Sequence, residues 1–131
     1  MGFPFYPQFV DHLVFLVEDL IRTRNFYEIL LGPPIQSSED SVMFLAGGTR
    51  IFFAPTLHTI PTFDKERIGL NHMAFGVRTL EELRQTAKQL DTAGIWHSGI
   101  VIDHYGSKEF LWLDDPDQMR LEFYLRAESK D

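Results

Sequence analysis

Residues 12–20, HLVFLVEDL, decide the fold, because residues 72–80, HMAFGVRTL, repeat them without a gap. In each copy an alternating apolar run, typical of a strand, gives way to helical spacing that ends at a glycine, Gly32 or Gly94. Asp19 and Thr79 are suited to cap the two helix starts. Short extended runs separated by turn residues follow each helix and indicate antiparallel strands. The sequence therefore predicts two copies of a β-α-β-β-β module.

The two modules together predict one α+β domain over residues 1–131. Module 1 spans about residues 8–55, a connector about 56–67, and module 2 about 68–126. The copies also end alike, since residues 50–53, RIFF, match residues 120–123, RLEF. We expect each helix to cover one face of a mixed sheet and the opposite faces to form a concave cup.

Composition excludes several classes of function. A net charge of -7, with no basic cluster to offset it, argues against nucleic acid as a partner. The chain has no cysteine, so any metal must bind through nitrogen and oxygen. No apolar run approaches the roughly 20 residues of a membrane span, and no basic segment precedes a signal-like run. We therefore expect a cytoplasmic protein that does not enter a membrane.

Strand alternation predicts which side chains face the cup. Bulky apolar residues on each first strand are expected under the helix, which turns His12 and His72 to the opposite face. On the last strand, Leu121 and Phe123 take the helix side, so Glu122 faces the cup. A lone strand histidine is more often a packing residue than a ligand. Two histidines at equivalent positions of a repeat favour ligation instead.

Four segments in this order resemble the vicinal oxygen chelate superfamily, which includes glyoxalase I, extradiol dioxygenases and bleomycin-resistance proteins. They are residues 11–14, DHLV; 71–75, NHMAF; 115–117, DPD; and 121–123, LEF. The resemblance implies the glyoxalase fold of paired βαβββ modules, a homodimer, and a metal at the base of the cup. In that family the equivalents of His12, His72 and Glu122 bind the metal.

Two imidazoles and one carboxylate on one face of an octahedron leave the opposite face open for substrate. A small substrate with adjacent oxygens can chelate there, and the cation acts as a Lewis acid or activates dioxygen. Fe(II) and Mn(II) are favoured by this ligand set, with Zn(II), Ni(II) or Co(II) as alternatives. The expected enzyme is a dioxygenase or a glyoxalase-like lyase or isomerase.

Several residues differ from those of related enzyme families, and these differences narrow the predicted reaction. Phe52 occupies the position where glyoxalase I takes a fourth ligand, which favours three protein ligands. Trp112 and Gln118 replace a tyrosine and a glycine of the extradiol dioxygenase signature, which weakens the case for catechol cleavage. Val14 replaces a threonine of the fosfomycin thiol transferases, so that activity is not favoured.

Further site residues follow from the same resemblance and from alternation. His104 is the first candidate acid or base, with Tyr105 and Tyr124 next, although His104 can equally be an exposed loop histidine. The predicted substrate pocket contains Arg50, Phe52 and Trp112 and is partly aromatic, with room for one anionic group. We interpret the two other histidines as surface or packing residues; they are His58 and His97.

Two alternatives to an enzyme remain open. A metal-free module could sequester a ligand in the same cup, as bleomycin-resistance proteins do. A degenerate family member could act only in protein interaction. Retention of both histidines and of Glu122 argues for metal binding.

Overall fold

The computed structural model describes residues 5–57 and 63–126. His58 and part of the predicted connector lie outside these residues. Contacts divide the chain into two compact units, Met1–Thr59 and Ile60–Asp131, and each is described by itself. Among the described residues no helix has the length and apolar character needed to cross a membrane.

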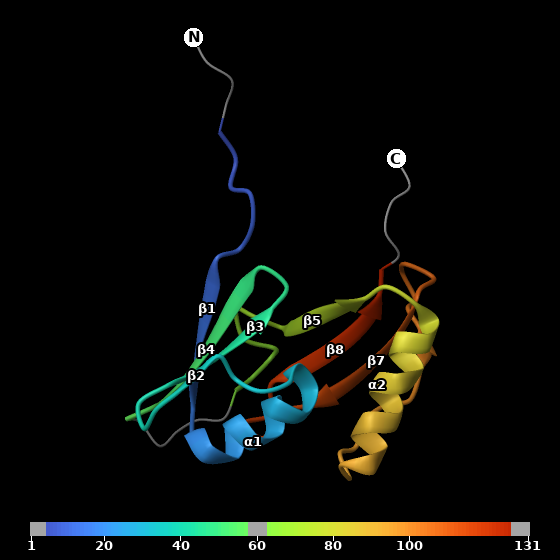
Figure 1. Cartoon of the computed structure of the whole chain (residues 1–131). Coiled ribbons are helices and arrows are strands. Elements are labelled where there is room, and N and C mark those ends of the chain that lie inside the picture. The colour runs from blue at the N-terminus through green and yellow to red at the C-terminus, as the bar shows by residue number, and fades with distance from the viewer. Residues whose placement is uncertain (1–4, 58–62, 127–131) are drawn as a thin grey trace. The chain divides into compact units, whose positions relative to one another are not determined.

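The first unit contains the predicted module 1 (Figure 1). Its elements are β1 (His12–Val17), α1 (Leu20–Leu31), β2 (Gln36–Ser37), β3 (Val42–Ala46) and β4 (Thr49–Pro55). The strand order is β1-β4-β3-β2, with β1 parallel to β4 and the other pairs antiparallel. The sheet is therefore mixed, as predicted.

The second unit repeats this topology. Its elements are β5 (His72–Val77), α2 (Leu80–Thr92), β6 (Val101–Ile102), β7 (Glu109–Asp114) and β8 (Arg120–Leu125). The order β5-β8-β7-β6, with β5 parallel to β8, matches the first sheet strand for strand. The predicted β-α-β-β-β repeat is confirmed.

Local signals in the sequence account for the helix ends. Asp19 accepts a hydrogen bond from the Arg22 N–H at the start of α1. Thr79 and Glu82 form a reciprocal capping box at the start of α2. After α2, Gly94 takes a left-handed φ of 72°, which favours glycine.

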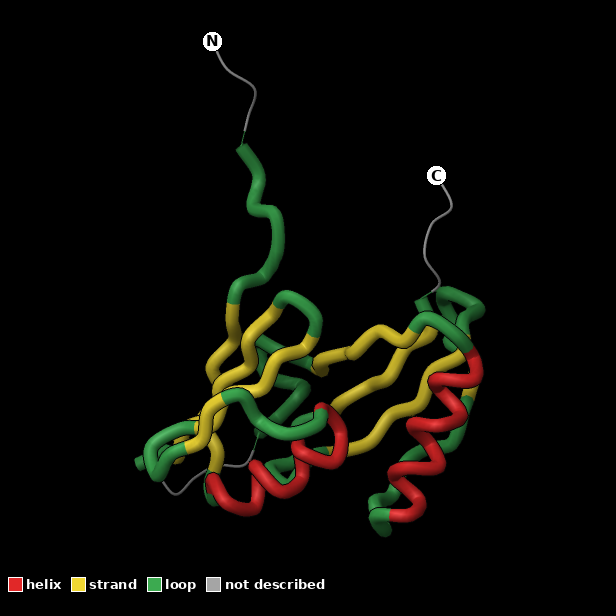
Figure 2. The backbone as a smooth tube through the Cα atoms, in the orientation of Figure 1, coloured by secondary structure: helices red, strands yellow, loops and turns green. Residues whose placement is uncertain are grey.

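Each helix covers one face of its own sheet (Figure 2). In the first unit Tyr27 from α1 is fully buried, with its ring centroid 4.3 Å from that of Phe53 in β4. In the second unit Leu83 and Leu90 from α2 are buried with Leu121 from β8. Because one face of each sheet is buried in this way, the register fixes which side chains of each strand lie on the other face.

Candidate metal centre

His72 and Glu122 share the face of the second sheet that α2 does not cover. In the parallel β5–β8 pair Ala74 lies opposite Glu122, and His72 stands two residues earlier on the same face. The small side chain of Ala74 leaves room for the imidazole and the carboxylate to approach. His72 Nε2 lies 3.5 Å from Glu122 Oε1, and the side chains are 39% and 12% exposed. The second unit thus brings together two of the three predicted metal ligands.

Asn71 fixes the tautomer of His72. Asn71 Oδ1 lies 2.7 Å from His72 Nδ1, while Asn71 Nδ2 donates to the backbone carbonyl of Lys65 at 2.9 Å. The second contact orients the amide, so its oxygen faces the imidazole and accepts the Nδ1 hydrogen. In the neutral imidazole of His72 the lone pair is therefore on Nε2, the nitrogen that faces Glu122.

In the first unit, the Nδ1 atom of His12 is held by the preceding residue in the same way. Its Nδ1 lies 2.9 Å from Asp11 Oδ2, which can only accept when ionised, so Nε2 again carries the lone pair. The Phe52 ring meets the His12 ring edge-on, with 5.8 Å between centroids. Phe52 occupies the position equivalent to Glu122 and has no side-chain oxygen. The first unit therefore provides one candidate ligand, His12, whereas the second provides His72 and Glu122.

The donor set of the second unit fits a divalent cation. Nitrogen and oxygen ligands lie about 2.0–2.2 Å from such an ion, so two neighbouring ligands stand about 3–3.5 Å apart. The separation of 3.5 Å between His72 Nε2 and Glu122 Oε1 is at the upper end of that range. Within residues 5–57 and 63–126, no group of three or more histidine or acidic side chains lies close enough to hold a metal ion.

A cavity of about 650 Å³ opens beside His72 and Glu122, within the second unit. Its apolar wall includes Phe75 and Phe110. Its polar lining residues come from the strands and from the loop after β6; they are His72, Asp103, Tyr105, Glu122, Tyr124 and Arg126. The proposed ligands thus stand at a cavity large enough for a small molecule.

Tyr124 and Asp103 form a hydrogen-bonded pair in this lining. The Tyr124 hydroxyl donates to Asp103 Oδ2, and the Tyr105 N–H donates to Asp103 Oδ1 at 3.0 Å. The bond from Tyr124 is the main cause that lowers the pKa of Asp103, and the same bond raises the pKa of Tyr124. A Cβ at Gly106 would lie 2.6 Å from the Tyr124 hydroxyl, so a larger residue there would require the loop or that side chain to shift.

The three predicted acid or base residues differ in placement. Tyr124 lines the cavity and is half-buried, but its hydrogen is donated to Asp103. Tyr105 also lines the cavity and is 94% exposed. His104 is exposed, and its ring meets Tyr105 edge-on with 5.5 Å between centroids. All three belong to, or contact, the loop that follows β6.

Among the predicted pocket residues, Trp112 lies on the same sheet face as the proposed ligands. It is opposite Glu122 in the β7–β8 pair. The Arg120 guanidinium stacks on its ring, 3.8 Å from the centroid, and Trp96 packs edge-on with 4.9 Å between centroids. Trp112 is therefore held between a cation and a second indole.

Arg50, the predicted anion-binding residue, lies in the first unit. It is opposite His12 in the β1–β4 pair, and its Nη1 lies 3.7 Å from Asp11 Oδ1. Its side chain is 51% exposed. The carboxylate of Asp11 therefore partly neutralises the charge that a ligand would use.

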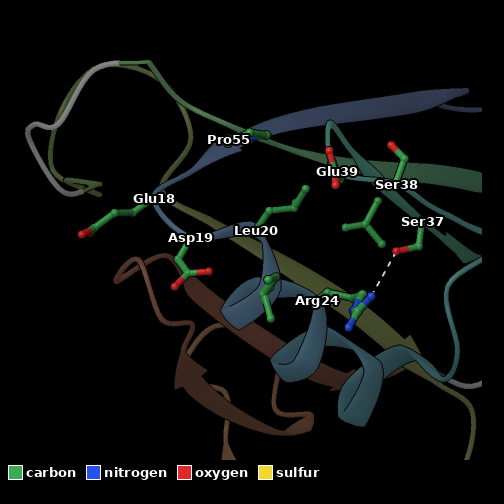
Figure 3. Close-up of a pocket in the computed structure, with 10 residues that line it drawn as sticks. Glu18, Asp19, Leu20, Arg24, Ser37, Ser38, Glu39 and Pro55 are labelled. Carbon is green, nitrogen blue, oxygen red and sulfur yellow. Dashed lines mark hydrogen bonds between the residues drawn. The ribbon is translucent and has the colours of Figure 1, made fainter.

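The first unit holds another cavity, of about 720 Å³, between the start of α1 and the β2–β3 region (Figure 3). Arg24 lines it and donates to the Ser37 hydroxyl at 3.3 Å. The other charged residues around it are acidic; they are Glu18, Asp19 and Glu39. None of the predicted site residues lines this cavity.

Comparison with known proteins defines the family. The family model of the Glyoxalase/Bleomycin resistance protein/Dioxygenase superfamily matches residues 9–123. The chain belongs to this superfamily, which confirms the resemblance found in the sequence. No curated protein matches the chain.

Solved structures show the same fold. A candidate glyoxalase from Bacillus halodurans is 23% identical, with a TM-score of 0.78, over 91% of this chain and 96% of that one. A glyoxylase/bleomycin resistance protein/dioxygenase domain from Frankia sp. EAN1pec is 23% identical, with a TM-score of 0.76, over 92% and 98%. Lactoylglutathione lyase from Agrobacterium tumefaciens is 12% identical, with a TM-score of 0.70, over 91% and 94%. At these identities the likeness establishes the fold alone.

Three residues of the site were not predicted from the sequence. Asn71 had a signal that can be recognised, because Asp11 and Asn71 precede the two equivalent histidines and both accept the Nδ1 hydrogen. Asp103 had none, since its partner Tyr124 is 21 residues away. Strand alternation puts Arg120 on the same face as Glu122, two residues later, but gives it no role.

Proposed function

We propose that this chain is a metal-dependent enzyme that chelates a small vicinal-oxygen substrate on a divalent cation held by His12, His72 and Glu122. The observation that carries the proposal is the approach of His72 Nε2 to Glu122 Oε1, at 3.5 Å, with His72 Nδ1 held by Asn71. His12 is the third proposed ligand, because its Nε2 is freed by Asp11 in the same manner.

The cation would supply Lewis acidity toward two adjacent substrate oxygens, or activate dioxygen if it is redox-active. Fe(II) and Mn(II) are favoured by two imidazoles and a carboxylate, and Zn(II), Ni(II) and Co(II) are alternatives. Asn71 and Asp11 orient the two imidazoles and would make their Nε2 atoms stronger metal ligands. Phe110, on the same sheet face as Glu122, supplies an apolar wall of the cavity.

Proton transfer is assigned to the loop after β6. His104 is the proposed acid or base, since the hydroxyl hydrogen of Tyr124 is already donated to Asp103. Tyr105 is the second candidate, because it lines the cavity and is exposed. Tyr124 holds Asp103, and through it the loop, beside the cavity.

The reaction class is narrowed by two side chains. Phe52 packs against His12 and provides no ligand oxygen, which disfavours the four-ligand site of glyoxalase I. Trp112 lacks the hydroxyl expected in extradiol dioxygenases and instead stacks with Arg120. A three-ligand lyase, isomerase or dioxygenase acting on another vicinal-oxygen compound fits these residues.

Metal analysis of the purified full chain tests the proposal. We expect about one divalent cation per site, either native or taken up from Fe(II), Mn(II) or Zn(II). His72→Ala should abolish stoichiometric uptake, whereas His97→Ala should retain it, because His97 contacts Asp91 and the Gly99 N–H instead. Wild-type protein that is folded but binds none of these ions would refute a metal centre.

A metal-free ligand-sequestering protein is the second candidate. The observation in its favour is that a protonated His72 can pair directly with Glu122, at the same 3.5 Å, with no cation. In that case His72→Ala would leave ligand affinity nearly unchanged. An enzyme with a metal centre would lose both metal and turnover.

We further propose a homodimer located in the cytoplasm. The dimer is supported by the apolar surface of β1, where Val14 and Leu16 are 58% and 65% exposed within one chain. A second copy could cover this surface and could also contribute a ligand to the site. Sedimentation that shows a monomer at micromolar concentration would refute the dimer.

A further inference from the structure

Arg120 is a half-buried cation beside the proposed ligands. In the β5–β8 pair it lies opposite His72, and on the other side of β8 its stacking partner Trp112 lies opposite Glu122. These pairings place Arg120 on the same sheet face as both proposed ligands, and its guanidinium lies over Trp112, outside the lining of the cavity at His72 and Glu122. A molecule that is chelated by the two ligands and extends along this face toward Trp112 would come close to its charge.

The guanidinium of Arg120 is positioned by Trp112, and its Nε is not used in a hydrogen bond within the described residues. Its carbon lies 3.8 Å from the Trp112 ring centroid, and a guanidinium stacked in this way keeps its N–H groups in its own plane, directed past the ring. Arg120 Nε is buried and has no hydrogen-bond partner within the described part of the chain. A buried donor left unsatisfied costs free energy. The terminal nitrogens of the guanidinium are the donors that a ligand on this face would meet first.

The two modules provide an internal comparison. Arg50 occupies the equivalent position in the first unit, opposite His12, and pairs with Asp11 at 3.7 Å. The ion pairs among the described residues do not include Arg120. Arg120 is therefore the one of the two that keeps its charge available for a ligand.

We propose that Arg120 forms an anion-binding subsite beside the metal centre, which selects vicinal-oxygen ligands that also carry a carboxylate. The inference rests on the proposed function for the vicinal oxygens, whereas recognition of the carboxylate rests on Arg120 itself. A planar carboxylate matches the fork of the guanidinium with two parallel hydrogen bonds. The nearby acidic side chains favour a monoanion over a doubly charged phosphate; they are Glu122 and, opposite Arg120 on β7, Asp114.

The test compares two probes that differ only in the carboxylate, catechol and 2,3-dihydroxybenzoate. Calorimetric titration of the full chain, loaded with Mn(II), should show at least about tenfold tighter binding of 2,3-dihydroxybenzoate, equal to about 1.4 kcal/mol. Arg120→Met should bring the ratio of the two affinities close to one. Arg84→Met, a matched change at an arginine paired with Glu81 on α2, should leave the ratio unchanged.

An alternative variant and a metal-free titration make the result of this experiment decisive. Arg120→Gln replaces Arg120→Met if circular dichroism shows that the methionine variant does not fold. The proposal is overturned if wild type shows no preference or binds neither probe, or if the preference follows Arg50→Met instead of Arg120. Repeating the titrations with metal-free protein separates the carboxylate subsite from the proposed metal centre. A preference for 2,3-dihydroxybenzoate that persists without metal supports the role of Arg120 even if the protein binds no metal.

Discussion

Tyr124 and Asp103, 21 residues apart in the chain, are joined by a hydrogen bond that ties the loop after β6 to the floor of the cavity. The hydroxyl donates, and the carboxylate accepts a second bond from the Tyr105 N–H at 3.0 Å. These bonds favour the ionised carboxylate and the neutral phenol, so the pair is strongest in the pH range where both states persist.

The first prediction concerns the pH dependence of stability. Because the pKa of Asp103 is lowered from 3.8, its carboxylate stabilises the fold above that pH, and the contribution is lost as the pH falls through the folded pKa. Because the pKa of Tyr124 is raised from 10.0, the phenol contributes below that pH, and its contribution is lost as the pH rises through the folded pKa. The difference in free energy of unfolding between wild type and Asp103→Asn should therefore be largest between these limits.

Urea denaturation at a series of pH values measures this difference. Tyr124→Phe is the control, since it removes the same hydrogen bond from the other side and should give a similar profile. A difference that stays constant from acid to alkaline pH would show that the pair does not link stability to protonation.

The second prediction tests the close approach of Gly106. In Gly106→Ala the new methyl group would lie 2.6 Å from the Tyr124 hydroxyl and 3.0 Å from Asp103 Oδ2, so the loop must move and the pair must weaken. We expect a loss of about 1–2 kcal/mol in the free energy of unfolding. Gly48→Ala is the matched control, because nothing lies within 4 Å of its added Cβ. In a Tyr124→Phe background, which removes the hydroxyl that the methyl group meets, the cost of Gly106→Ala should shrink, and equal costs in both backgrounds would contradict the mechanism.

Local signals made most of the fold predictable from the sequence. The repeated strand openings, the caps at Asp19 and Thr79, and the alternation around Glu122 each depend on a few neighbouring residues, and all were found as expected. Asp103 depends on a loop conformation and on a partner in another strand. No short-range pattern encodes such a contact.

The candidate site was predictable in part for the same reason. Alternation placed His72 and Glu122 on one face, and the register confirms it. Trp112, which was predicted from the resemblance, lies on the same face. It could not distinguish Arg50 from Arg120, because the two occupy equivalent positions in the repeat. The difference lies in the surrounding side chains. Arg50 forms an ion pair with Asp11, whereas Arg120 stacks on Trp112.

The third prediction concerns Asn71 and metal affinity. Asn71 accepts the His72 Nδ1 hydrogen, so Asn71→Ala should free the imidazole to rotate and to change tautomer. Metal affinity should fall by about 10–100-fold, and Asn71→Asp, which keeps an acceptor oxygen, should retain most of it. Calorimetric titration with Mn(II) measures the affinity, and nitrogen NMR of the metal-free protein reports the His72 tautomer. Unchanged affinity and tautomer in Asn71→Ala would contradict the role of Asn71.

The fourth prediction uses the turn before β8. Gln118 has a φ of 71°, a left-handed conformation that costs a residue with a side chain more than glycine. Gln118→Gly should raise the free energy of unfolding by up to about 1 kcal/mol, since relief of strain exceeds the added entropy of the unfolded chain. The matched control is Gln85→Gly in the exposed part of α2, which should be destabilising by about 1 kcal/mol. Destabilisation of both variants would show that Gln118 makes a favourable contact that outweighs its backbone strain.

The fifth prediction concerns Thr23, which is fully buried in α1 while its hydroxyl has no hydrogen-bond partner in the described part of the chain. Thr23→Val keeps the branched shape and replaces the hydroxyl with a methyl group. It should raise the free energy of unfolding by about 1 kcal/mol, because an unsatisfied buried hydroxyl is removed and helix propensity hardly changes. Thr86→Val in α2 is the comparison, because there the hydroxyl donates to the Glu82 carbonyl at 2.9 Å and its loss should bring little or no gain. Urea denaturation of both variants decides the matter, and a Thr23→Val protein less stable than wild type would mean that the hydroxyl is satisfied by ordered water.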